Sequence, residues 1–347
     1  MRLNQLPKRP AEFYEGLPKV DLHRHLEGSL RFETIRELAR QQGMDMPPTA
    51  QLRTMVQVGE DEPLSFENFL SKFATLRLFY RSPEIISRIT YEAIIDAAAD
   101  NVRHLELRFT PVALSRVQGF SLAEVMDWVI EGRQRALADC GLSAGLIASI
   151  NRHESVALAA QVSYLAAERI EAGIVGLDLA GNEVDFPAKP FEEVFSAARK
   201  NGLHTCVHAG EWGTGENVLH AVREMGAERI GHGIRVLESP EAVELALEKG
   251  IPFEVCITSN YQSGAVQMVE SHPIMEMNTR GLNVTINSDD PSISRICLSD
   301  EYRLACEVLG MNLVALKGCI LAAAQASFLP DEGRRALVDT IQEEFVL

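Results

Sequence analysis

Eight short runs of strand-forming residues, separated by stretches of helical periodicity, constrain the fold of this chain most strongly. This alternation is typical of parallel βα units, and eight such units close a barrel. The runs are rich in apolar and β-branched residues, as expected of strands that are buried on both faces. The sequence therefore predicts an α/β fold, a (β/α)8 TIM-type barrel. The predicted strands begin at Val20, Arg103, Ala144, Ile174, His204, Arg229, Pro252 and Asn283.

Two segments are additional to the eight βα units of the barrel. A helical insert, at about 29–99, separates the first two predicted strands, and a helical tail that includes LVALKGCILAAAQASF follows the eighth. An insert at this position lies beside the face where such barrels build their active sites, so we expect it to act as a lid. A length of 347 residues is within the range that α/β barrels reach as one domain, and we expect 1–347 to form a single metal-dependent hydrolase domain.

Composition excludes several function classes. The chain has 33 Lys plus Arg against 49 Asp plus Glu, and its net charge of -16 disfavours nucleic acid and anionic membranes as partners. The start of the chain is too polar for a signal peptide, and we find no run of about 18 apolar residues that could span a bilayer. Six cysteines without a CxxC pair indicate reduced thiols. We expect a cytoplasmic protein of undetermined oligomeric state.

Histidines and carboxylates cluster at the predicted strand ends. His23 and His25 alternate with period two on the first strand, so both imidazoles face the barrel interior. His208 ends the fifth strand and Asp289 the eighth, and these four residues suit a catalytic zinc site with a position open for water. The fourth strand, GLDLAGNE, lacks the lysine that would bridge two metals, so we expect one Zn²⁺ per chain.

Three further polar residues supply what a hydrolysis on an electron-poor ring requires. The metal lowers the pKa of its water toward ~7, but an acid must still protonate the ring. Glu211 follows a predicted ligand in a pocket where desolvation would raise its pKa. His232, between two glycines, could orient or deprotonate the water, and Asp290 could bind a substrate N–H.

With these residues in place, the sequence closely resembles the adenosine deaminase family of the amidohydrolase superfamily, from about Leu17 to Phe328. The motifs LPKVDLHRHLEGS, GLDLAGNE, VHAGE, RIGHG, FEVCITSN and NSDDP occur in the family's order. Any one motif would be weak support, whereas six in order at strand ends are a specific signal.

The resemblance implies a role for each matched residue. It assigns the Zn²⁺ ligands to His23, His25, His208 and Asp289. Glu211 would donate a proton to purine N1, and His232 would aid the attacking water. Asp290 would contact purine N7, and the Gly181 backbone N–H would contact N3. It also implies an apolar helix over the purine pocket, matched by spacing at Phe66, Phe69, Leu70 and Phe73.

Two departures from the family pattern concern the substrate. Glu27 stands where many adenosine deaminases have an aspartate that contacts the ribose 5′-hydroxyl, and CITSNYQSG lacks the proline that commonly follows the cysteine. We expect hydrolytic deamination of adenosine and 2′-deoxyadenosine. A deaminase of adenine or a modified adenosine and a non-catalytic, zinc-stabilised purine-binding protein remain the alternatives. A cytidine-type zinc deaminase is disfavoured because it requires a Cys pair.

Several of these residues also have purely structural explanations. Asp289 and Asp290 precede Pro291 and could serve only as a helix N-cap and its neighbour. Glu211 could pair with a nearby base, and the Phe stripe could be ordinary core packing. We assign no role to Arg108, Asn151 or the other five histidines, which are His104, His153, His204, His220 and His272.

Overall fold

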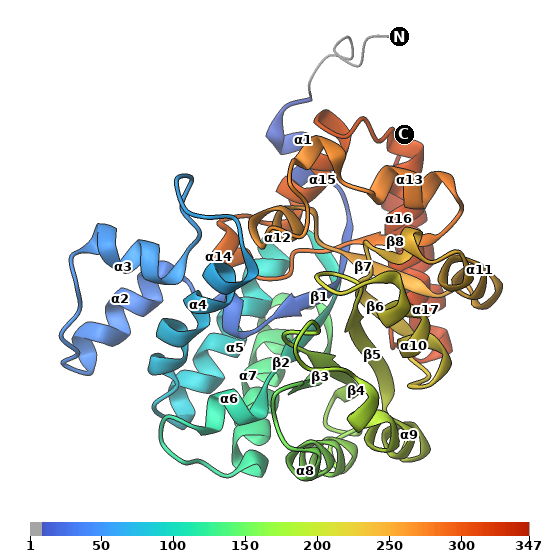
Figure 1. Ribbon diagram of the computed structural model, residues 1–347. Helices are drawn as coiled ribbons and strands as arrows, with labels where there is room; N and C mark the ends of the chain where they lie inside the picture. The colour runs from blue at the N-terminus through green and yellow to red at the C-terminus, as the bar shows by residue number, and fades with distance from the viewer. Residues whose placement is uncertain (1–8, 347) are drawn as a thin grey trace.

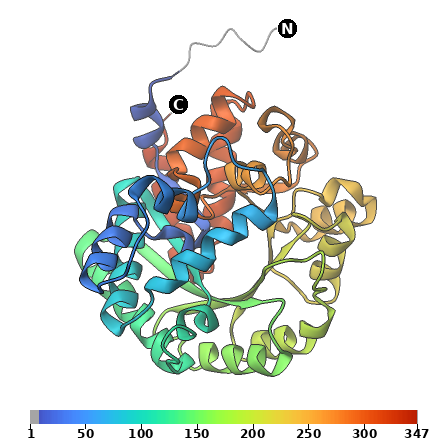
Figure 2. The same ribbon diagram turned by 60° about the vertical axis from the view of Figure 1, so that its left-hand side comes forward.

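The computed structural model describes residues 9–346 and contains eight parallel strands that hydrogen-bond in chain order, from β1 to β8. Figure 2 shows the strands as a ring surrounded by helices. A bridge between Arg24 and Asp289 joins the first strand to the segment that directly follows the last. There the His25 N–H donates to the Asp289 carbonyl at 2.8 Å, and the Asp289 N–H donates to the His23 carbonyl at 2.7 Å. The predicted (β/α)8 barrel is confirmed.

All eight strands occur where the sequence predicted them. The last two end earlier than expected, because the apolar run after β7 turns into helix α12 (Ile257–Gln262) and β8 stops three residues before Asp289. A short apolar run does not by itself distinguish a strand from a buried helical turn. The bounds are β1 Lys19–His25, β2 Val102–Phe109, β3 Ser143–Asn151, β4 Ile174–Ala180, β5 His204–Ala209, β6 Arg229–His232, β7 Pro252–Val255 and β8 Asn283–Ile286.

The helices between strands pack against the outside of the barrel. The longest, α7 (Leu122–Cys140), begins with a reciprocal capping box between Ser121 and Glu124 and ends at Gly141, whose φ of 66° is left-handed. The other helical segments from β2 to β8 are α6 Pro111–Ser115, α8 Val156–Ala167, η3 Lys189–Phe191, α9 Glu192–Lys200, α10 Gly215–Arg223, η4 Val236–Glu238, α11 Pro240–Lys249, η5 Val269–Ser271 and α13 Ile274–Thr279.

Helical segments fill the chain between β1 and β2, across the predicted insert at about 29–99. The last of them, α5 (Pro83–Ala99), packs against α7 and β2, and is therefore the barrel helix of the first βα unit. The segments before it form the insert proper, of which α4 lies across the mouth of the barrel in Figure 2, in light blue. Their bounds are η1 Glu27–Ser29, α2 Phe32–Gln41, α3 Thr49–Val56, α4 Phe66–Leu76 and η2 Arg77–Phe79.

The helical tail is in part an integral barrel helix. Helix α16 (Leu313–Ala326) packs against β8, β1 and β7, and so completes the helical layer. Helices α15 (Leu298–Glu307) and α17 (Asp331–Glu344) pack against α16, and α1 (Ala11–Glu15) packs on α15. The short helix α14 (Pro291–Ser294) packs on η1 and α12 instead. Among the described residues no helix is long and apolar enough to cross a membrane. The expectation about a signal peptide concerns in part residues 1–8, which lie outside the described residues.

Two helical glycines provide a matched test of this packing. A Cβ at Gly132 of α7 would collide with the Ser87 carbonyl oxygen and the Thr90 side chain of α5, whereas a Cβ at Gly318 of α16 would meet nothing within 4 Å. We expect Gly132→Ala to lower the free energy of unfolding by about 1–3 kcal/mol through overpacking. Gly318→Ala should leave it unchanged or raise it by up to about 1 kcal/mol. Denaturant titration of both variants measures this, and equal effects would contradict the α5–α7 contact.

Candidate active site

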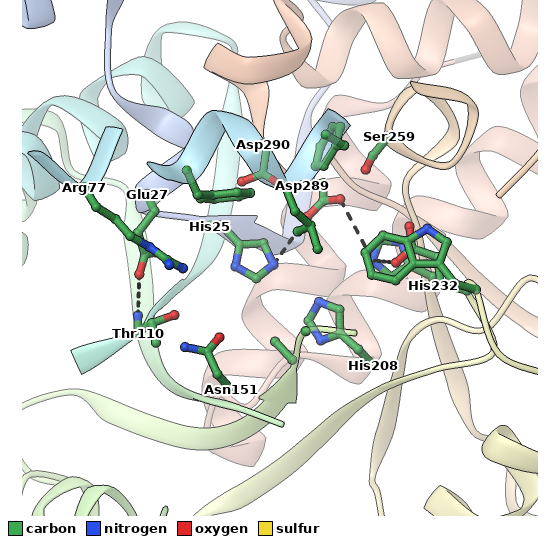
Figure 3. Close-up of a pocket in the computed structure, with 17 residues that line it drawn as sticks. His25, Glu27, Arg77, Thr110, Asn151, His208, His232, Ser259, Asp289 and Asp290 are labelled. Carbon is green, nitrogen blue, oxygen red and sulfur yellow. Dashed lines mark hydrogen bonds and ion pairs between the residues drawn. The ribbon is translucent and has the colours of Figure 1, made fainter. Parts of the chain in front are cut away.

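Three imidazoles meet at the carboxyl ends of the strands. The ring nitrogens of His23, His25 and His208 come within 4.8 Å of one another. Asp289 completes the group, because its Oδ1 lies 3.4 Å from both His23 Nε2 and His25 Nε2. Figure 3 shows His25, His208, His232 and Asp289 around one pocket. The structure thus brings together the four residues that the sequence predicted as metal ligands.

The backbone turns sharply at two of the site residues. His232 and Asp289 both have φ of 59°, a left-handed conformation that is rare outside glycine and costs about 1–3 kcal/mol. At Asp289 the turn coincides with the bridge that closes the barrel, and at His232 it ends β6. Asp290 is the N-cap residue of α14, but its side chain makes no cap hydrogen bond. Helix capping therefore does not explain this pair of aspartates.

Two buried carboxylates orient the imidazoles. His23 Nδ1 lies 2.8 Å from Glu254 Oε2, and His208 Nδ1 lies 3.0 Å from Asp178 Oδ1. Each carboxylate accepts the Nδ1–H, so the neutral ring presents its Nε2 lone pair to the centre of the group. Burial opposes ionisation, but Arg108 and Arg229 hold the pKa of Glu254 well below its usual range.

The charge balance of the group favours a cation at its centre. Burial lowers the pKa of His25, His208 and His232, so these rings are neutral. Burial also disfavours a charged His23, but the neighbouring carboxylates of Asp289 and Glu254 raise the pKa of that ring overall. His23 Nε2 is buried and lies 3.4 Å from Asp289 Oδ1 without forming a hydrogen bond. Imidazoles beside a carboxylate, with a buried ring nitrogen that no hydrogen bond satisfies, match what a zinc ion requires of its ligands.

Glu211 is buried beside this group. Burial, followed by the charges of Asp289 and Glu183, raises the pKa of Glu211 well above its usual value. Its Oε2 lies 3.5 Å from His232 Nε2, and its Oε1 accepts hydrogen bonds from Asn260 Nδ2 at 3.2 Å and Ser263 Oγ at 3.3 Å. The base beside Glu211 is thus His232, whose pKa burial lowers, and these contacts include no Lys or Arg.

The loop that carries Glu211 is anchored on one carboxylate. Glu183 accepts four successive backbone N–H groups, those of Gly210, Glu211, Trp212 and Gly213, at 2.7 to 2.9 Å. A carboxylate with four donors is stable when buried, and Glu183 is only 5% exposed. The residue therefore fixes the path of the chain directly after β5.

The pocket extends from the histidines to the underside of α4. Phe69, Leu70 and Phe73 line it, as predicted, whereas Phe66 lies outside the lining and packs on Trp212 with ring centroids 5.4 Å apart. Gly181 also lines the pocket, and its φ of 97° is one that glycine adopts without strain. His23 lies beneath the pocket surface with no exposed area.

A second polar group lies on the far side of the pocket from His232, as Figure 3 shows. Glu27 Oε1 accepts the Thr110 N–H at 2.8 Å, while its Oε2 is buried without a partner. Arg77 and Asn151 line the same end. Asp290 Oδ1 is likewise buried and unpartnered, and burial, then Asp289 and Glu27, raises the pKa of Asp290 well above its usual value. These oxygens are available to a bound molecule.

The residues that the sequence did not reveal lie one layer behind the pocket. Asp178, Glu254 and Asn260 contact the predicted histidines, and Arg108, which we had assigned no role, donates to Glu254 Oε2 at 2.7 Å. Asp178 and Glu254 occupy strand positions whose side chains face the barrel interior. A charged residue at an inward-facing position of a buried strand was the feature of the sequence that could have identified them.

Comparison with known proteins agrees with this geometry. The model of a family described as adenosine deaminase matches residues 18–344. The chain belongs to the adenosine deaminase family. An adenosine deaminase from Clostridium botulinum is 36% identical over 332 residues, which cover 95% of this chain and 98% of that protein. The chain is therefore a hydrolytic aminohydrolase.

Solved structures of similar proteins show that members of this fold differ in substrate. An adenine deaminase from Arthrobacter aurescens has 29% identity and a TM-score of 0.87, covering 94% of this chain and 98% of its own. An amidohydrolase from Burkholderia ambifaria with bound Zn has 29% identity and a TM-score of 0.87, covering 98% of this chain and 97% of its own. The N6-methyl-AMP deaminase of Arabidopsis thaliana has 28% identity and a TM-score of 0.85, covering 96% of this chain and 98% of its own.

The anchoring role of Glu183 predicts a local effect. Glu183→Gln replaces one accepting oxygen by an NH2 group that faces a backbone donor, so we expect faster hydrogen exchange at residues 210–213. The free energy of unfolding should fall by about 1–3 kcal/mol, the cost of a buried unsatisfied donor. Glu193→Gln, at an exposed position of α9, is the matched control. Unchanged exchange at 210–213 in Glu183→Gln would refute the anchoring role.

Proposed function

We propose that the protein is a zinc-dependent deaminase that hydrolyses adenosine, and 2′-deoxyadenosine, to the 6-oxo nucleoside and ammonia. The observation that carries the proposal is the convergence of three Nε2-presenting imidazoles and Asp289 beside a buried, proton-holding Glu211. The family provides the reaction class, and the side chains of this chain supply the parts that the reaction requires.

Zinc would be held by His23, His25, His208 and Asp289, one ion per chain. Bound zinc lowers the pKa of water to about 7 and so makes a nucleophile available at neutral pH. Glu254 and Asp178 set the ring orientation of two ligands. The bound Zn of the similar Burkholderia amidohydrolase supports the choice of metal.

The residue that donates the proton and the residue that orients the water lie on the same side of the pocket. Because its pKa is raised, Glu211 holds a proton at neutral pH and donates it to purine N1 as water adds to C6. His232 orients the attacking water by a hydrogen bond from the adjacent strand end. The amino group then leaves as ammonia with the proton of the added hydroxyl group, which gives the 6-oxo product, and the proton released by the water restores Glu211.

The remaining pocket residues bind the purine. Asp290 contacts N7, which is an acceptor, and the raised pKa of Asp290 favours the protonated form that such a bond requires. The Gly181 N–H donates to N3. Phe69, Leu70 and Phe73 cover the ring from α4, and Phe66 secures the edge of this lid against Trp212.

A nucleoside fits the polar end of the pocket better than a free base. Adenine would leave Glu27 Oε2 without a partner, at the cost of a buried unsatisfied acceptor, whereas a sugar hydroxyl can donate to it. The similar adenine and N6-methyl-AMP deaminases keep adenine and a modified adenosine as the alternative substrates.

The test is a substrate panel with the zinc-loaded protein. Adenosine, 2′-deoxyadenosine, adenine and N6-methyl-AMP are compared by kcat/KM from the loss of absorbance in the adenine band. We expect the two nucleosides to rank first. A preference for adenine or the nucleotide would overturn the substrate assignment, and absence of ammonia from every purine would favour the non-catalytic purine-binding alternative.

Two variants distinguish the role of the proton donor from that of a metal ligand. Glu211→Gln keeps the shape of the side chain but removes the transferable proton, so we expect zinc content to be retained and kcat to fall by roughly 10²–10⁴-fold. Asp289→Ala should lower zinc content and kcat together. Metal analysis and steady-state kinetics measure both, with the exposed Glu224→Gln as control. Near-normal kcat in Glu211→Gln would remove it as the acid.

A further inference from the structure

A chain of buried hydrogen bonds leads from the start of α13 to Glu211 and His232. The Ile274 N–H donates to His272 Nδ1 at 3.2 Å, and His272 Nε2 lies 3.2 Å from Asn260 Oδ1. Asn260 Nδ2 in turn lies 3.2 Å from Glu211 Oε1 and 3.1 Å from His232 Nδ1. The four side chains that take part are at most 4% exposed. The hydrogen bonds that link these side chains are therefore shielded from solvent.

The direction of the chain follows from its first link. A backbone N–H can only donate, so His272 Nδ1 is an acceptor, and the neutral ring carries its hydrogen on Nε2. Burial lowers the pKa of His272 to about 3, which keeps the ring neutral. His272 Nε2–H then requires an acceptor, and this orients Asn260 with Oδ1 toward His272 and its NH2 group toward the active site.

The orientation of Asn260 determines the state of the two residues beyond it. One hydrogen of the NH2 group goes to Glu211 Oε1, which also accepts from Ser263 Oγ, so the transferable proton belongs on Oε2. The other goes to His232 Nδ1, which must be an acceptor, so the hydrogen of neutral His232 lies on Nε2. His232 Nε2 is 3.5 Å from Glu211 Oε2 and 3.9 Å from Asp289 Oδ2.

We propose that His272, acting through Asn260, is a positioning residue that fixes His232 as the Nε2–H tautomer and orients Glu211 with Oε2 free. In this tautomer His232 offers a hydrogen-bond donor toward the pocket and is not a base at Nε2. The effect of this arrangement on the reaction rate rests on the proposed deamination, whereas the pattern of donors and acceptors from His272 to His232 does not. Asn260 lies in the CITSN segment, on α12, so this segment contributes to the geometry of the site and not only to its border.

Histidine tautomers in the zinc-loaded protein test the proposal directly. Long-range proton–nitrogen NMR on protein with ¹⁵N-labelled histidine distinguishes Nε2–H from Nδ1–H rings. We expect His272 and His232 both as Nε2–H in the unaltered protein. In Asn260→Asp the carboxylate can only accept, so His232 should switch to a ring with hydrogen on Nδ1. An Nδ1–H His232 in the unaltered protein, or no change in Asn260→Asp, would overturn the proposal whatever the substrate proves to be.

Kinetics of His272 variants test the consequence for the reaction. His272→Leu removes the donor, and misplacement of the two groups should lower kcat on the order of 10²-fold with KM and zinc content nearly unchanged. His272→Gln retains an N–H for Asn260 Oδ1 and should recover most of kcat, which a purely space-filling role would not predict. His220→Gln, on α10, is the matched control. Equal losses in His272→Gln and His272→Leu, with the tautomer of His232 unchanged, contradict the relay.

Discussion

The site depends on an ion-pair network buried in the barrel. Arg108 Nη2 donates to Glu254 Oε2 at 2.7 Å, and Arg108 Nη1 lies 3.5 Å from Asp178 Oδ2. All three side chains have no exposed area. Isolated carboxylates at such depth would take up protons, but Arg108 keeps them ionised at the cost of its own desolvation. The ionised carboxylates in turn hold the Nδ1–H groups of His23 and His208, so the charge at the centre of the barrel determines where the imidazole lone pairs point.

The upper half of the site is held by backbone and loop contacts instead of ion pairs. Glu183 ties the Glu211 loop through four amides, and left-handed turns at His232 and Asp289 direct these side chains into the pocket. The same loop contributes Trp212, whose ring packs on Phe66 of α4. Helix α4, the Glu211 loop and the strand ends are thus connected by direct contacts, and the barrel supports a pocket that a separate helical segment lines.

The sequence predicted the barrel and the inner ring of the site because both depend on local patterns. Strand alternation fixed His23 and His25 on one face, and the strand-end motifs located His208, Glu211 and Asp289. The sequence did not predict Asp178, Glu254 or the His272–Asn260 contact, because these partners are distant in the chain and their roles follow from packing across the barrel. For a similar reason the sequence did not identify α5 as a barrel helix, since this follows only from its packing on α7.

The most direct test of the account is X-ray absorption at the zinc edge of protein loaded with one equivalent of the metal. His23 and Asp289 also form a group with Cys256, so the ligand set has a definite competitor. The account predicts a first shell of nitrogen and oxygen at about 2.0–2.1 Å, with the outer scattering of three imidazoles. A sulfur ligand at about 2.3 Å, or fewer than three imidazoles, would contradict the claim that three histidines, two of them oriented by buried carboxylates, bind one metal.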